Sequence, residues 1–193
     1  GSIGADQLVT LQPSEGSSTD IEWDSGFQNA GTLRLTSDDG SSSVMLNMGG
    51  GSQTLINSGT VVVDGLSNYL SGRRIRGQVD NQGQFTASAD MEIDYSSSNE
   101  PDVINSGTFT IDAGVEVWTD HFRMGGGTLD HQGELRVDRF DYNGGVISGN
   151  PITVQDLTLD GGGAGAFIVT GYGNLSGSIG ADQLVTLQPS EGS

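Results

Sequence analysis

The feature that most constrains the fold of this chain is a short phrase that recurs along it. In residues 103–112, an apolar residue is followed two positions later by Asn105 and two positions after that by Gly107. Apolar residues then stand two and four positions further on. Related phrases occupy residues 27–35, 55–64, 79–85 and 129–137, and weaker ones follow Gln155 and Gln183. Alternating apolar residues indicate a strand with one buried face. Asn-x-Gly indicates a bend, because Asn and Gly tolerate positive φ.

The spacing of this phrase predicts how the strands stack. Positions equivalent to Gly107 fall at residues 31, 59, 83, 107, 133, 155 and 183. The steps between them are roughly 22–28 residues long, and repeats of this length, built from strands and turns, are typical of solenoids. The alignment produces two apolar columns without charge. The first contains Leu33, Val61, Phe85, Phe109, Leu135, Leu157 and Val185, and the second contains Leu35, Val63, Ala87, Ile111, Val137, Leu159 and Leu187.

We therefore predict an all-β fold, a right-handed parallel β-helix (β-solenoid), as one continuous segment over residues 1–193. Residues 1–17 and 177–193 are identical, so a second copy of the first segment begins at residue 177. About seven coils of roughly 22–28 residues are expected to close one such 176-residue repeat. The duplication predicts a tandem array in which the next repeat stacks coaxially on this one, with an axial advance of about 34 Å per repeat.

Charge and composition exclude several classes of partner. The chain has 25 acidic residues and seven basic ones, all Arg, and its formal net charge is −18. Nucleic acids and anionic membrane surfaces bind clustered cations, so neither is an expected partner. No apolar run approaches the length of a membrane span, so we expect no membrane insertion. Disorder does not explain two apolar columns that keep their register.

One column of the repeat is occupied by amides: Asn29, Asn57, Asn81 and Asn105. At a stacking distance of about 4.8 Å, amide side chains satisfy one another's donors and acceptors along the column. We expect a structural Asn ladder, with a groove for a polar ligand as the alternative. His131 continues this column in the alignment and is expected to take the place of an Asn.

Carboxylates after the first strand of a coil are candidates for binding a cation. In the predicted stack Asp112 lies on Asp138, and Asp138 lies on Asp160. Stacked carboxylates repel unless they are hydrated or bridged by a cation, and calcium accepts carboxylate oxygens in flexible geometry. Asp38 and Asp39, in a loop, are candidates for the same ion. Simple solvation of the surface is the alternative, and no other cofactor is expected.

A polysaccharide-acting enzyme is a third hypothesis, because glycosidases use two carboxylates across a cleft. Asp38-Asp39 and Arg74-Ile75-Arg76 resemble fragments of polygalacturonase motifs. The accompanying Gly-His-Gly is missing, and the chain has no Lys. We therefore expect no catalysis and identify no catalytic residue.

Residues 143–154, with the Asn-Ser-Gly-Thr-Phe of residues 105–109, resemble the β-helical repeats of large bacterial surface and secreted proteins. Filamentous-haemagglutinin-type adhesins and autotransporter passengers are of this kind. The resemblance implies an extracellular or cell-surface setting and a rod-like shape. It favours a structural module, the shaft of a long fibre whose partner is its own next repeat, with lateral bundling of fibres. The alternative is an adhesin-type module that presents loops to glycans or to a neighbouring cell.

Overall fold

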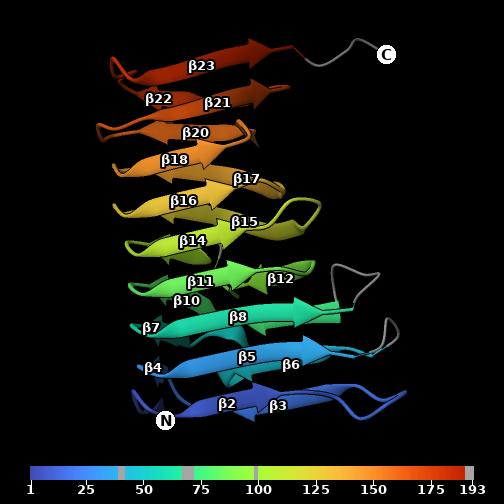
Figure 1. Ribbon diagram of the computed structural model, residues 1–193. Coiled ribbons are helices and arrows are strands. Elements are labelled where there is room, and N and C mark those ends of the chain that lie inside the picture. Colours follow the sequence, from blue (N-terminus) through green and yellow to red (C-terminus); the bar gives the residue numbers. More distant parts are fainter. Residues whose placement is uncertain (39–41, 67–71, 98–99, 190–193) are drawn as a thin grey trace.

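In the computed structural model, residues 1–38, 42–66, 72–97 and 100–189 are described, and every strand pairing in that part is parallel. The strands form sheets of 13, seven and three strands. The same residues contain no α-helix and one 3-10 turn, η1 (Gly49–Gly51). Figure 1 shows layers of strands that stack from the N-terminus to the C-terminus. The fold is thus all-β with parallel sheets, which is consistent with a solenoid.

Each layer contributes strands to two or three faces, which we number in the order in which the chain meets them. The first face contains β1 (Ser2–Ile3), β4 (Phe27–Asn29), β7 (Thr54–Asn57), β10 (Gln78–Asn81), β13 (Val103–Asn105), β20 (Asp156–Leu159) and β22 (Leu175–Gly177). The second face contains β2 (Leu8–Leu11), β5 (Thr32–Ser37), β8 (Thr60–Gly65), β11 (Gln84–Ala87), β14 (Thr108–Ile111), β16 (Thr128–His131) and β18 (Val146–Gly149).

The third face begins with β3 (Thr19–Trp23), β6 (Val44–Met48), β9 (Arg73–Arg76) and β12 (Met91–Asp94). Two long strands, β15 (Glu116–Met124) and β17 (Glu134–Tyr142), start on the third face and continue into the first face of the next layer. They join both faces into the 13-stranded sheet. The three-stranded sheet near the C-terminus contains β19 (Ile152–Val154), β21 (Gly165–Thr170) and β23 (Gln183–Gln188).

Pairing on the first face fixes the length of each layer. Successive partners are Ile3, Asn29, Asn57, Asn81, Asn105, Met124, Tyr142, Leu159 and Gly177. The layers that end at Asn105 or before it are roughly 24–28 residues long, within the range of solenoid repeats, and the later ones are shorter, roughly 17–19 residues. The prediction of seven coils of similar length is therefore wrong. Eight steps separate Ile3 from Gly177, and we call the first four layers wide and the following ones narrow.

The sequence predicted too few coils because similar turns occur at two different corners of the stack. The bends at Gly59, Gly83 and Gly107 lead from the first face to the second, whereas the bend at Gly133 leads from the second face to the third. Leu135 consequently pairs with Val117 on the third face instead of joining the predicted column. For the same reason Leu157 pairs with Phe140 and Val185 pairs with Phe167.

Apolar side chains fill a continuous core between the faces. The first inward column of the second face runs through Val9, Leu33, Val61, Phe85, Phe109, Leu129 and Ile147. Phe85 stacks on Phe109 with ring centroids 4.4 Å apart, and Phe109 meets Phe122 edge-on at 5.4 Å. All three side chains are fully buried, and such pairs add about 0.5–1.5 kcal/mol each beyond their buried area. From Leu33 to Phe109 this register confirms the column derived from the sequence.

Glycine at the first corner is required by close approach of the backbones. A Cβ on Gly107 would lie 2.2 Å from the carbonyl oxygen of Gly83, and a Cβ on Gly83 would lie 2.2 Å from that of Gly59. None of these three residues has positive φ, and no described non-Gly residue has it either. The expectation that Asn and Gly adopt positive φ at this bend is therefore wrong. The bend needs the missing side chain, because the backbone of each layer rests on that of the layer before it.

Candidate functional site

The four asparagines of the first face form a hydrogen-bonded ladder inside the stack. Asn29 Nδ2 donates to Asn57 Oδ1 at 2.8 Å, Asn57 Nδ2 to Asn81 Oδ1 at 2.7 Å, and Asn81 Nδ2 to Asn105 Oδ1 at 2.7 Å. Each Nδ2 also donates to a backbone carbonyl on the second face, at 2.9–3.0 Å. All four residues are 0% exposed. The ladder fastens the first corner of the wide layers and is closed to a ligand in solvent.

The ladder ends where the narrow layers begin. The residue paired with Asn105 is Met124, and Tyr142 follows it. His131 lies elsewhere, because it pairs with Ile111 on the second face. The prediction that His131 continues the ladder is therefore wrong. Its ring is 2% exposed, and both ring nitrogens are without a hydrogen-bond partner among the described residues. Burial lowers the pKa of His131 and favours the neutral imidazole, although nearby backbone groups oppose this shift in part.

The carboxylates predicted to form a calcium column lie at different corners. Asp112 follows β14 on the second face and accepts a hydrogen bond from Ser88 Oγ at 2.6 Å. Asp138 lies in β17 at the corner between the third and first faces, and Asp160 follows β20 on the first face. The predicted stacking of Asp112 on Asp138 and of Asp138 on Asp160 is therefore wrong.

The loop candidates for calcium are only partly described. Asp38 is exposed and accepts a hydrogen bond from Gln12 Nε2, and Asp39 lies outside the described residues. In the part of the chain that the structure describes, no group of three or more His, Asp or Glu side chains is arranged to hold a metal ion. The described carboxylates thus supply no preformed calcium site.

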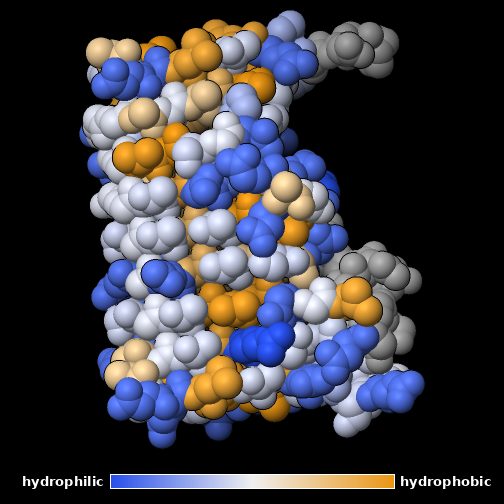
Figure 2. Space-filling model, viewed as in Figure 1, coloured by the Kyte–Doolittle hydropathy of each residue, from blue (hydrophilic) through white to orange (hydrophobic). Residues whose placement is uncertain are grey.

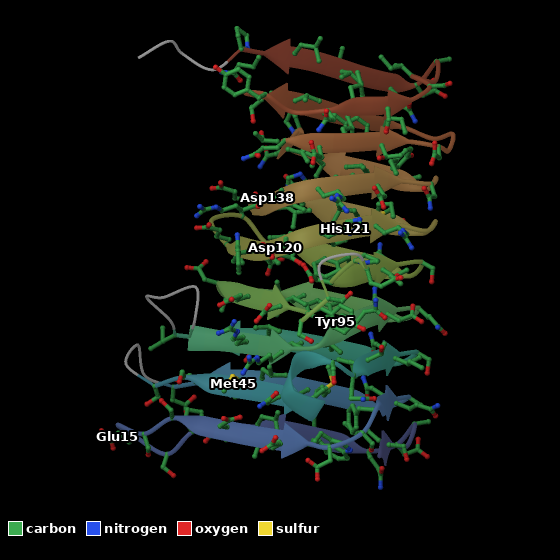
Figure 3. All side chains as sticks on the ribbon, turned by 180° about the vertical axis from the view of Figure 1, so that it is seen from behind. Glu15, Met45, Tyr95, Asp120, His121 and Asp138 are labelled. Atoms are coloured by element: carbon green, nitrogen blue, oxygen red, sulfur yellow. The ribbon has the colours of Figure 1, made fainter. Side chains whose placement is uncertain are left out.

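A different acidic cluster lies at the corner between the third and first faces. Extending the pairing of β12 with β15 and of β15 with β17 brings Asp94, Asp120 and Asp138 onto successive layers. Figure 3 shows Asp120 and Asp138 on neighbouring strands at this edge. Burial raises the pKa of Asp120, and the charges of Asp138 and Asp94 raise it further. The sequence alignment missed this cluster because it assigned Asp138 to another corner.

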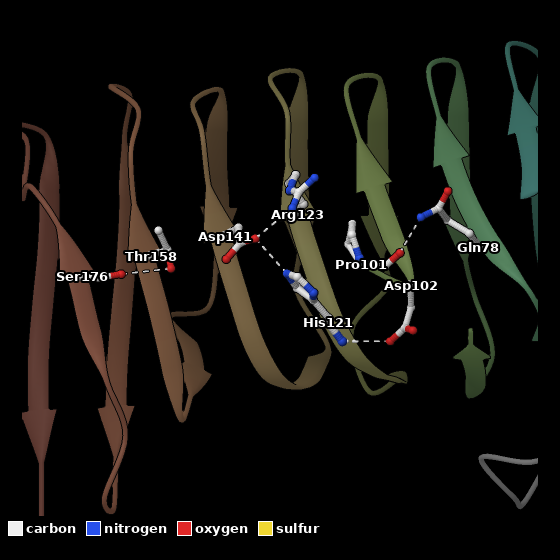
Figure 4. Close-up of polar contacts among 8 residues, drawn as sticks. All are labelled: Gln78, Pro101, Asp102, His121, Arg123, Asp141, Thr158 and Ser176. Carbon is white, nitrogen blue, oxygen red and sulfur yellow. Dashed lines mark hydrogen bonds and ion pairs between the residues drawn. The ribbon is translucent and has the colours of Figure 1, made fainter. Parts of the chain in front are cut away.

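The residues on either side of Asp120 in β15 belong to a polar network, part of which is drawn in Figure 4. His121 Nε2 lies 2.8 Å from Asp141 Oδ2, and Arg123 lies 3.4 Å from the same oxygen. Asp102, which is 2% exposed, accepts hydrogen bonds from the backbone N–H of His121 at 2.8 Å and the hydroxyl of Thr119 at 2.9 Å. Burial raises the pKa of Asp102, and these donors oppose the rise. The network joins residues from the segment before β13, from β15 and from β17 into one corner.

Two adjoining cavities border this corner. The smaller, of about 250 Å³, lies between the segment that precedes β13 and the strands β15, β17 and β20. The larger, of about 490 Å³, lies along β17 and β19. Asp138 and Gln155 line both, so the two cavities form one groove, which we call the corner groove. Figure 2 shows that the narrow layers beside it stand back from the wide layers.

No family model, curated protein or solved structure matches the chain. The described residues include no helix that is long and apolar enough to cross a membrane.

One turn of the duplicated segment has the same hydrogen bond at both ends of the stack. Gly4 N donates to Gln7 Oε1 at 2.6 Å, and in the second copy Gly180 N donates to Gln183 Oε1 at 2.7 Å. A strand follows each turn, β2 in the first copy and β23 in the second. Among the described strands β2 pairs only with the following layer and β23 only with the preceding one. The two copies of this strand are therefore paired on opposite sides.

Both ends of the stack expose apolar side chains beside open strand edges. Leu8 on β2 is 65% exposed, and Leu184, its counterpart on β23, is also 65% exposed. Leu187 and Ile179 are exposed as well. An unpaired edge with apolar side chains is a template for a further parallel strand.

Proposed function

We propose that the chain is a structural repeat of a long extracellular or cell-surface fibre, a right-handed parallel β-helix that serves as a rigid shaft and is not catalytic. The observation that carries this proposal is the duplicated segment, whose turn and following strand recur in both copies and pair on opposite sides. Superposing the copies gives a continuous column in which Val9, equivalent to Val185, is flanked by Phe167 of one repeat and Leu33 of the next.

The junction obtained in this way resembles the rest of the stack. Leu8 and Leu184 are the same position, and each lacks the neighbour that the other has. Joining the repeats would cover the inward side chain of Leu187, because it would then lie against Leu35, as its counterpart Leu11 does. Burying apolar surface contributes about 25 cal/mol per Å², so the junction favours coaxial stacking over separate blocks. The partner in this proposal is the next repeat of the same chain.

The repeat length then predicts an axial period. Eight steps bring Ile3 to Gly177, just before its duplicate Ile179. At a strand spacing of about 4.8 Å, eight layers advance about 38 Å, in place of the about 34 Å that seven coils would give. The right-handed form of the proposal rests on the usual hand of connections between parallel strands.

Proteins with one, two and four tandem 176-residue blocks test the proposal. Small-angle scattering should give a constant cross-section and a rod length that grows by about 38 Å per block. A matched control carries a flexible Gly/Ser linker at each block junction, and it should lose rigidity without losing the fold of the blocks. Failure of the rod length to grow with block number would contradict the proposal, as would equal rigidity of the control.

A further inference from the structure

We propose that the corner groove binds a cationic amino-sugar chain. This site is independent of the shaft role, because it lies within one repeat. The groove is formed by the step between wide and narrow layers: the segment before β13 borders one side, and the corners of β15 and β17 form its floor. The larger of its two cavities, of about 490 Å³, is in the size range of binding sites for small ligands, and the smaller, of about 250 Å³, adjoins it.

The charge of the groove selects a cation. Six carboxylates line it against two guanidinium groups, those of Arg136 and Arg139; the carboxylates belong to Glu100, Asp102, Asp120, Glu134, Asp138 and Asp156. The side chains of Asp120 and Asp138 have no hydrogen bond or ion pair with any described residue. They repel each other across one layer, and an ammonium group between them relieves that repulsion.

Two buried imidazoles provide an independent indication of a ligand. His131 lines the larger cavity with both ring nitrogens unpartnered among the described residues, and it is 2% exposed. His121 lines the smaller cavity, is 7% exposed, and has an unpartnered Nδ1. Buried polar groups without a partner are costly and uncommon. A hydroxyl group both donates and accepts, so a neutral imidazole is suited to bind one.

The same residues argue against other cations. No three described carboxylates or imidazoles are arranged to hold a metal ion, so a bare divalent cation is disfavoured. None of the described lining residues is Trp, Tyr or Phe, so the groove offers no platform on which a neutral sugar ring stacks. A chain with one ammonium and several hydroxyls per unit fits both the carboxylates and the imidazoles.

Binding of a fluorescently labelled glucosamine tetramer to the 193-residue protein tests this proposal. We expect one site per chain, and about tenfold weaker binding when Asp120→Asn and Asp138→Asn are combined. The matched control combines Asp112→Asn with Asp160→Asn, which makes the same charge change at other corners and should alter binding less than about twofold. Circular dichroism and melting curves verify that both variants fold.

Three competitors distinguish the cation from the sugar. The N-acetylated tetramer lacks the charge and should bind much more weakly. Spermine has charge without ring hydroxyls and should compete poorly, whereas the unlabelled glucosamine tetramer should compete fully. Equal loss of affinity in the two double variants would overturn the site. Spermine binding as tightly as the amino sugar, or tighter binding of the acetylated tetramer, would overturn the ligand class. The rod-length measurement is unaffected by any of these results, so the two proposals fail separately.

Discussion

Replacing Asn81 by Ala, in the middle of the ladder, should destabilise the fold more than replacing Asn29 at the end of the ladder. Asn81 is fully buried and makes three hydrogen bonds: it accepts from Asn57 and donates to Asn105 and to the carbonyl of Thr108. Each such bond contributes about 1 kcal/mol, and a buried group left without its partner costs about 1–3 kcal/mol. Allowing for overlap between these terms, we expect a loss of about 3–5 kcal/mol.

Two matched variants make this expectation specific. Asn29 Oδ1 has no partner among the described residues, so Asn29→Ala removes two hydrogen bonds instead of three and should cost about 2–3 kcal/mol. Asn174 is exposed and donates to Asp156 at 2.8 Å, so Asn174→Ala should cost less than about 1 kcal/mol. The expected order of destabilisation is Asn81, then Asn29, then Asn174.

Urea denaturation followed by circular dichroism measures these differences. With a slope of about 2–3 kcal/mol per molar urea, the midpoint for Asn81→Ala should fall by roughly 1–2 M. Because a stack of layers can unfold from its ends, a second probe near the middle of the chain should give a coincident transition before free energies are compared. Equal midpoints for the Asn81 and Asn174 variants would refute the reasoning that the ladder stabilises the corner.

Three further predictions concern the backbone corner, the acidic cluster and calcium. Gly107→Ala should lower the melting temperature strongly, because its Cβ would lie 2.2 Å from the carbonyl oxygen of Gly83; Gly162→Ala, whose Cβ meets nothing within 4 Å, is the control and should be near neutral. The raised pKa of Asp120 means that the folded state binds more protons than the unfolded state, so stability should increase as pH falls from neutrality through that pKa. Melting curves of Asp120→Asn should show a smaller increase, and an unchanged increase would contradict this assignment. If the loop with Asp38 and Asp39 binds calcium, the melting temperature should be higher in calcium than in chelator at matched ionic strength, because a ligand of the folded state stabilises it; identical melting curves would remove this candidate.

The strands and the wide layers could be predicted from the sequence. Alternating apolar residues place the strands, and the recurrence of Asn-x-Gly sets the register from Leu33 to Phe109 because the same corner repeats each time. The narrow layers could not be predicted in this way, since Gly133 belongs to a different corner and a two-residue period cannot tell which face a strand joins. Gly-rich runs at residues 125–127, 144–145 and 161–163 were the available signal for the narrow layers.

The candidate sites were less predictable than the fold. The column of Asn residues follows directly from the repeat, but the position of Asp138 depends on counting the layers correctly. The contact between Asp102 and His121 joins residues 19 positions apart at the corner between the third and first faces, and no local pattern fixes such a contact. Arg73 is another example: it is 0% exposed and donates to the carbonyl of Asp64, where a charged residue would be expected on the surface.

The unequal layers have a consequence for how shafts of this kind would lie side by side. If blocks follow one another, groups of four wide layers alternate with groups of four narrow layers. The width of the shaft therefore rises and falls once every eight layers. At the strand spacing of parallel sheets, that period is about 38 Å. Two parallel shafts whose wide layers lie at the same height would touch only through those wide layers. If one shaft is shifted along its axis by about half that period, roughly 19 Å, its wide layers lie beside the narrow layers of the other shaft. The variation in layer length thus sets a preferred axial offset between neighbours without any specific contact residue.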